Sequence, residues 1–139
     1  MKCQHWEKPL EALEKELVAA ITASRYYARR NYILGYGVAA TTVISSIAAG
    51  LTVGLPIIPV EATAALASLP AAMVACTTVF RFDQKSAWFW RKSKRLDSLL
   101  RAIRYESADL ATASKAFSQI EEDMEQEWVS FGTPGKSST

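Results

Sequence analysis

The feature that most constrains this chain is a run of fifty residues, 31–80, that holds a single charged side chain, Glu61. All 16 Lys and Arg residues lie outside the run. A surface-facing part of a small soluble domain needs more charge, whereas two apolar helices that cross a bilayer carry this little. The run therefore predicts two membrane spans joined by a tight loop. The alternative is a buried helical hairpin in a soluble protein, but the remaining chain is too polar to wrap one.

Chain length and helix-breaking residues set the bounds of the two spans. The first is expected over 32–53, about 33 Å of helix, and the second over 62–80, about 28 Å. Both lengths suit about 30 Å of bilayer hydrocarbon. A glycine and two prolines in 54–61 end the first helix, and Glu61 begins the second, where the helix dipole favours a carboxylate. Pro70 removes a backbone hydrogen bond and should bend the second span, as a structural feature or as a hinge for gating.

The distribution of basic residues predicts the orientation of the spans. Lys and Arg precede the first span and follow the second, and the connecting loop has neither. The positive-inside rule then places both termini in the cytoplasm. Residues 81–104 carry eight basic and two acidic groups, either as a topology signal or as a site for anionic lipid headgroups. Side chains suited to the membrane interface are Arg29, Arg30, Tyr32, Arg81 and Trp88.

Helical patterns flank the spans. Pro9 can open a helix over 9–30 that runs into the first span. Its apolar face is formed by Leu10, Leu13, Leu17, Ile21, Ser24 and Ala28. This face favours packing on the C-terminal helix, with a membrane-surface helix as the alternative. Residues 81–131 are expected as one long helix or as a helix pair that turns near 107–114, and residues 132–139 as a disordered tail.

A seven-residue apolar row runs along the C-terminal helical segment. It includes Leu96, Ile103, Leu110, Phe117 and Met124. A repeat of this period is typical of a coiled-coil or bundle seam. We therefore expect the row to form a seam between chains of a homo-oligomer.

Small side chains recur every four residues in both spans. They are Thr42, Ser46, Gly50 and Gly54 in the first span, and Ala64, Ser68, Ala72 and Cys76 in the second. Small faces let helix backbones approach closely in lipid. The two ladders either pack against each other within one hairpin, or one of them pairs between protomers. A third alternative is a pore lining, shared with Thr41, Ser45, Thr63 and Thr77.

No residue pattern points to catalysis. The chain has one His, no spaced Cys set and no pair of carboxylates in an apolar setting. Cys3 and His5 offer too few ligands for a structural zinc site. We therefore expect no enzymatic activity, cofactor or metal, and no nucleic-acid partner, because the basic residues form no known reader.

The segments that flank the spans resemble those of a known family. The first span is entered through Arg25-Tyr26-Tyr27-Ala28-Arg29-Arg30-Asn31-Tyr32. The second is left through Phe80-Arg81-Phe82-Asp83-Gln84-Lys85-Ser86-Ala87-Trp88, followed by Arg95-Leu96 and Leu99. With a short two-span hairpin between them, the chain resembles the SLATT family over residues 9–128. This family comprises the SMODS- and SLOG-associating two-transmembrane effector domains of bacteria.

The resemblance implies a membrane effector of a nucleotide-signalling antiphage system. Such an effector would assemble in the bacterial inner membrane and permeabilise it, which causes abortive infection. We expect no attached sensor domain, so the trigger would be a partner protein or the product of a nucleotide-synthesising partner. The alternative function is a non-conducting membrane anchor or scaffold for a cytoplasmic partner.

Overall fold

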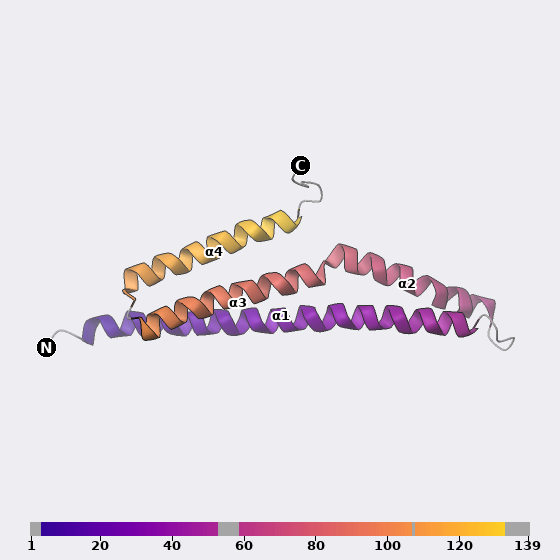
Figure 1. Cartoon of the computed structure of the whole chain (residues 1–139), viewed down its shortest axis with the longest axis horizontal. Coiled ribbons are helices and arrows are strands. Elements are labelled where there is room, and N and C mark those ends of the chain that lie inside the picture. The colour runs from indigo at the N-terminus through magenta and orange to yellow at the C-terminus, as the bar shows by residue number, and fades with distance from the viewer. Residues whose placement is uncertain (1–3, 53–58, 107, 133–139) are drawn as a thin grey trace. The chain divides into compact units, whose positions relative to one another are not determined.

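The computed structural model describes residues 4–52, 59–106 and 108–132. Four helices account for 96% of these residues, and the described part of the chain has no strand, so the predicted all-α class is confirmed. The helices are α1 (Gln4–Thr52), α2 (Val60–Phe80), α3 (Phe82–Tyr105) and α4 (Leu110–Gly132) (Figure 1). The predicted connecting loop, with Gly54, and the predicted C-terminal tail fall largely outside the described residues.

The chain divides into two compact units. Residues 1–28 and 87–139 form one, and residues 29–86 form the other. We call them the three-helix unit and the two-helix unit. Helices α1 and α3 contribute residues to both.

The helix α1 begins earlier than predicted and continues without a break. It starts at Gln4, so Pro9 lies inside the helix rather than at its opening. Pro9 is the sixth residue of α1, past the four N–H groups that have no intrahelical acceptor, so it removes one backbone hydrogen bond from the second turn. The predicted apolar face is confirmed, since Leu17, Ile21 and Ala28 are buried.

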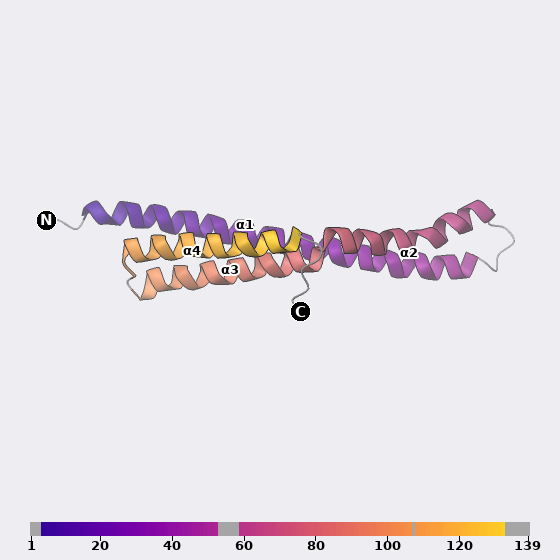
Figure 2. The same cartoon turned by 90° about the horizontal axis from the view of Figure 1, so that it is seen from above.

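The three-helix unit is built around one apolar core. Figure 2 shows α4 alongside α3 and the first half of α1. The buried cluster consists of Leu17, Ile21, Leu96, Leu99, Leu100, Ile103 and Ala113, with Leu10, Leu13, Phe117 and Ile120 packed against it. Helix α3 ends at Tyr105 and α4 begins at Leu110. Of the two alternatives for residues 81–131, the helix pair is therefore the one observed, with a break that overlaps the start of 107–114.

The seven-residue apolar row lies inside this core. Leu96, Ile103 and Met124 are buried, and Leu110 and Phe117 are half-buried, all within one chain. We had expected these residues at a seam between chains, and the structure corrects that expectation. The row instead holds α3 and α4 together and against α1, because a turn between α3 and α4 lets its two halves face one another.

In the two-helix unit, α2 lies beside the second half of α1. The half-buried or buried positions of α1 recur at alternating spacings of three and four, at Asn31, Gly35, Val38, Thr42, Ser45, Ala49 and Thr52. Those of α2 include Thr63, Leu66, Pro70, Met73 and Thr77. This spacing is typical of two helices that pack along a shared seam. Most side chains of the α1 seam are small, so the two backbones can lie close together.

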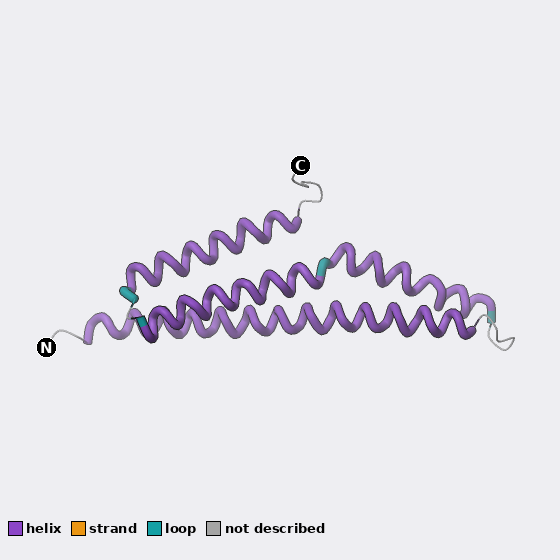
Figure 3. The backbone as a smooth tube through the Cα atoms, viewed as in Figure 1, coloured by secondary structure: helices purple, strands orange, loops and turns teal. Residues whose placement is uncertain are grey.

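Two local features shape α2. Pro70 lies within the helix, as the sequence indicated, and Figure 2 shows that α2 is curved along its length. The helix then ends at Phe80, and its C-cap residue Arg81 adopts a left-handed conformation (φ 47°, ψ 48°) and donates its N–H to the Thr77 carbonyl at 3.0 Å. Figure 3 shows this break as a short loop between α2 and α3. Helices α2 and α3 are therefore separated by the single residue Arg81.

Candidate functional site

The two-helix unit exposes an extensive apolar surface. Two helical stretches are long and apolar enough to cross a membrane, and only 6% and 0% of their most apolar windows are buried. Bulky side chains on this surface include Ile33, Leu34, Val43, Ile44, Ile47 and Leu51. An apolar helix in the core of a soluble protein would instead be mostly buried. Contiguous apolar surface of this kind marks contact with lipid or with another protein.

Every Ser and Thr hydroxyl group of the described residues in 31–80 donates to a backbone carbonyl close to it in the sequence. The nine donors are Thr41, Thr42, Ser45, Ser46, Thr52, Thr63, Ser68, Thr77 and Thr78. Each donates to a backbone carbonyl three or four residues earlier, at 2.8–3.5 Å. The free-energy cost of moving a hydroxyl group out of water is much smaller when the group is hydrogen-bonded in this way. The Ser and Thr side chains are therefore compatible with a hydrocarbon environment, in which polar groups must be satisfied internally.

The small-residue ladders face mostly outward. Thr42 and Cys76 are half-buried between the two helices, while Ser46, Gly50, Ala64, Ser68 and Ala72 are exposed. Gly54 lies outside the described residues. The two ladders therefore do not pack against each other within one chain, which was one of the two packing alternatives. The exposed members leave the second alternative, contact between protomers, open.

The space around each glycine of α1 shows which of them face another helix. A Cβ placed on Gly50 or on Gly37 would meet no atom within 4 Å. A Cβ on Gly35 would lie 3.2 Å from the Cβ of Phe82 and 3.5 Å from an Asp83 carboxylate oxygen. The close approach of helices is thus at Gly35, which the sequence reasoning missed. Its signal was available, because Gly35 lies seven residues before Thr42 on the same face.

The hydroxyl residues that were considered as a pore lining do not share one outward face. Ser45 is buried, Thr63 and Thr77 are half-buried between the helices, and only Thr41 is exposed. In one chain these residues belong mainly to the helix–helix seam.

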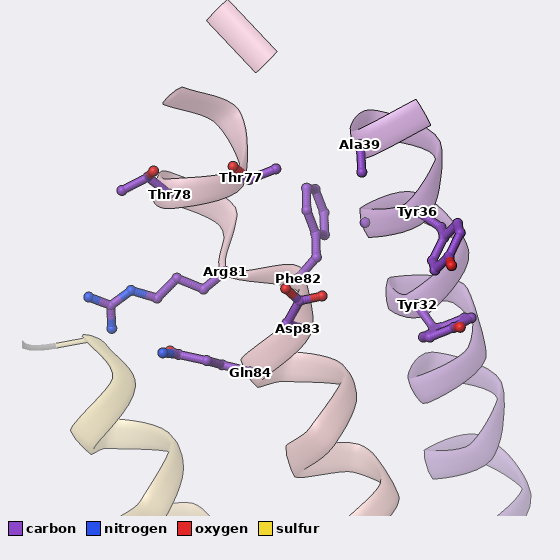
Figure 4. A pocket seen from close by; sticks show the side chains of 10 residues that line it. Tyr32, Tyr36, Ala39, Thr77, Thr78, Arg81, Phe82, Asp83 and Gln84 are labelled. Carbon is purple, nitrogen blue, oxygen red and sulfur yellow. The ribbon is translucent and has the colours of Figure 1, made fainter. Parts of the chain in front are cut away.

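A cavity of about 630 Å³ lies where α2 passes into α3. It is lined by Tyr32, Gly35, Tyr36, Ala39, Thr77, Thr78, Arg81, Phe82, Asp83 and Gln84. Figure 4 shows the Phe82 ring pointing between the helices and the Arg81 side chain extending away from α1. The cavity combines aromatic walls with polar groups of both charges, and no group of side chains converges on one point within it.

Four of the five predicted membrane-interface residues lie at the surface or half-buried. Arg29, Arg30 and Tyr32 are exposed, and Arg81 is half-buried. Trp88 is the exception, because only 7% of it is exposed and its indole N–H donates to the Met124 carbonyl at 3.0 Å. Trp88 is therefore a core residue of the three-helix unit.

The basic excess of α3 is largely matched within the chain. Arg91 pairs with Glu127 at 2.5 Å, Arg95 with Asp123 at 3.3 Å and Lys92 with Glu121 at 3.7 Å, which connects α3 to α4. Two further pairs, Arg25–Asp97 and Arg104–Glu14, connect α1 to α3. Such exposed pairs contribute little stability each, but they orient the helices and reduce the charge available to lipid headgroups.

Within the described residues, no group of three or more His, Cys, Asp or Glu side chains could hold a metal ion. Comparisons of the chain with protein-family models, with curated proteins and with solved structures find no match. Its surfaces and contacts are therefore the basis for a functional proposal.

Proposed function

We propose that this chain is an oligomeric two-span protein of the bacterial inner membrane, a SLATT-like effector that opens a pore or disrupts the membrane during antiphage defence. The observation that carries the proposal is the two-helix unit, which directs bulky apolar side chains outward while its Ser and Thr hydroxyl groups between residues 31 and 80 donate to nearby backbone carbonyls. Exposed apolar side chains are unfavourable in water and favourable in lipid, and paired hydroxyl groups can enter lipid without losing a hydrogen bond. The pore function itself comes from the resemblance of the segments that flank the spans.

The proposed topology is a hairpin with both termini in the cytoplasm. Glu61 lies in the first turn of α2, and no basic residue lies in the last turn of α1 or α2. Arg29 and Arg30 precede the apolar part of α1, and the basic residues of α3 follow α2. The positive-inside rule favours this orientation. The three-helix unit would then be the cytoplasmic part that receives the signal from a separate partner.

Conduction requires several protomers, because two helices cannot enclose an aqueous path. Protomers would meet through the outward small-residue ladders, since close packing drives helix association in lipid. The bulky face of α1, with Ile33, Ile44 and Ile47, would face the acyl chains. Assembly through the seven-residue row is not part of this proposal, because that row is buried within the chain.

The test is induced expression of the chain in bacteria, together with its neighbouring genes, with a membrane-potential dye as the readout. We expect wild-type protein to depolarise the cells and Gly50→Leu to abolish depolarisation. Because a side chain at Gly50 meets nothing within its own chain, a loss of activity would report on contacts between protomers. Gly37→Leu is the matched control, since Gly37 is equally open. Equal activity of wild-type protein and Gly50→Leu, at equal expression, would exclude the ladder as an assembly face.

The alternative is a non-conducting anchor or scaffold, and one observation favours it. The Ser and Thr hydroxyl groups of the described residues in 31–80 are bonded to backbone carbonyls. Of the four hydroxyl residues that were considered alongside the ladders for a pore lining, three lie in the helix–helix seam. Wild-type protein that inserts but never depolarises cells beside its neighbouring genes would support the anchor.

A further inference from the structure

An aromatic patch lies on the three-helix unit, at the end of α4. Tyr26 and Tyr27 of α1 contact each other with ring centroids 5.5 Å apart, and Tyr27 stacks on Phe89 of α3 at 5.4 Å. Phe89 in turn lies 6.1 Å from Trp128 of α4, and Val129 follows Trp128. We call these five residues the aromatic patch. Tyr26 is 62% exposed and Val129 is 65% exposed, so part of the patch is not covered by the chain itself.

The C-terminal end of α4 is held at this patch by specific contacts. The rings of Trp88 and Trp128 lie 4.9 Å apart, and the Trp88 indole N–H donates to the Met124 carbonyl. Glu127, which precedes Trp128 in α4, pairs with Arg91 of α3 at 2.5 Å. These contacts fix Trp128 beside α3 and next to the Tyr27–Phe89 stack, although it lies about a hundred residues from Tyr27 in the sequence.

The α1 residues of the patch come shortly before the apolar stretch of the same helix. Helix α1 is continuous, so Tyr27 lies five residues, or about 7.5 Å along the axis, before Tyr32, where the apolar stretch begins. The headgroup layer of a bilayer is about 5–8 Å thick on each side of the hydrocarbon. Tyr and Trp are enriched in that layer, and the exposed Arg29 and Arg30 would attract anionic headgroups there.

We propose that the aromatic patch docks on the anionic headgroup layer of the bilayer and that Trp128 and Val129 bring the end of α4 to the membrane surface. This inference rests on the proposed insertion of the two-helix unit. It adds a third membrane contact, made by a helix that does not cross the bilayer. The three-helix unit would then lie against the membrane through α4, with its orientation fixed by that contact.

The test measures the lipid contact of single labelled positions. Val129→Cys, Gln119→Cys and Ile44→Cys are each made in the full chain with Cys3→Ser and Cys76→Ser, labelled with bimane and placed in nanodiscs of phosphatidylethanolamine and phosphatidylglycerol. Gln119 is the matched control, because it is exposed on α4 about 15 Å before Val129. With acyl chains brominated near the headgroup, we expect quenching at Val129 about twofold or more above that at Gln119. Circular dichroism checks that each variant is folded.

Each outcome separates this inference from the proposed function. Quenching at Ile44 with Val129 no different from Gln119 would overturn the docking of the patch and leave membrane insertion intact. No quenching at any position would overturn both. A Val129 label that is shielded from water without lipid quenching would show that a protein covers the patch, which also overturns the proposal. Tyr26→Cys is a second reporter, and we expect it to be quenched like Val129.

Discussion

The indole N–H of Trp88 in α3 donates a hydrogen bond to the backbone carbonyl of Met124 in α4, at 3.0 Å. The same side chain packs on Trp128, and the ammonium group of Lys92 lies 5.6 Å from its ring centroid. A buried indole N–H needs an acceptor, and here the neighbouring helix supplies it. This bond therefore helps to hold α4 on α3, and Trp88 is buried inside the three-helix unit.

Trp88→Phe should lower the free energy of unfolding by about 1–3 kcal/mol, since the bond to α4 is lost and a gap is left in the core. The measurement is denaturant unfolding of the detergent-solubilised protein, followed by circular dichroism. Trp90→Phe is the control, because Trp90 is exposed and its loss should change stability by no more than about 0.5 kcal/mol. Equal stability of the two variants would contradict the role of Trp88.

Ile103→Asp should unfold the three-helix unit rather than separate protomers. Ile103 is buried among Leu96, Leu99 and Leu100, and a charge there should cost several kcal/mol. Limited proteolysis should then cut α3 and α4 rapidly. Ser98→Asp places the same charge on the exposed side of α3 and should remain resistant. If the Ile103→Asp protein stays folded and only its oligomer becomes smaller, Ile103 lies in a seam between chains instead.

Gly35→Leu should weaken the contact between α1 and the start of α3, because a side chain there would meet Phe82 at once. The expected loss is about 1–3 kcal/mol, as for an overpacked core. Titration with a denaturing detergent, read by circular dichroism, measures it. Gly37→Leu occupies open space and should leave the transition unchanged. A stable Gly35→Leu protein would show that Phe82 moves aside without cost.

Cysteine labelling tests the proposed orientation. In a background without the native cysteines, an impermeant thiol reagent added to intact cells should label Glu61→Cys, in the first turn of α2. It should not label Ser118→Cys, on α4, until the cells are opened. Labelling of Ser118→Cys alone in intact cells would reverse the topology and place the three-helix unit outside.

The faces of individual helices could be read from the sequence, because burial follows helical spacing. The apolar face of α1 from Leu10 to Ala28 and the seven-residue row of α3 and α4 are examples. What the spacing could not show is the partner of each face. A row with a period of seven looks the same whether it meets its own chain or another, so the core role of Ile103 required the structure.

Interface residues were harder to predict for a related reason. An aromatic residue beside a basic segment fits the membrane surface, and it equally fits a core when an acceptor from a distant helix is available. The acceptor for Trp88 lies 36 residues later and leaves no local signal. The break at Arg81 was also hidden, since a left-handed residue is usually Gly or Asn and this segment has neither at that position.

The left-handed Arg81 separates two helical phases. The inward positions of α2, at Pro70, Met73 and Thr77, would continue in an unbroken helix to Arg91, Lys94 and Ser98. In the second half of α3 the buried positions include Ser93, Leu96, Leu100 and Ile103, displaced by two residues, or about 200° of helical rotation. One non-helical residue thus allows α2 to bury its own face while α3 buries its leucines and turns its arginines to solvent. In a continuous helix, two inserted residues would also rotate the buried face of α3 by about 200° relative to that of α2. We therefore expect the chain to tolerate an insertion of two residues at Arg81 better than an insertion of one.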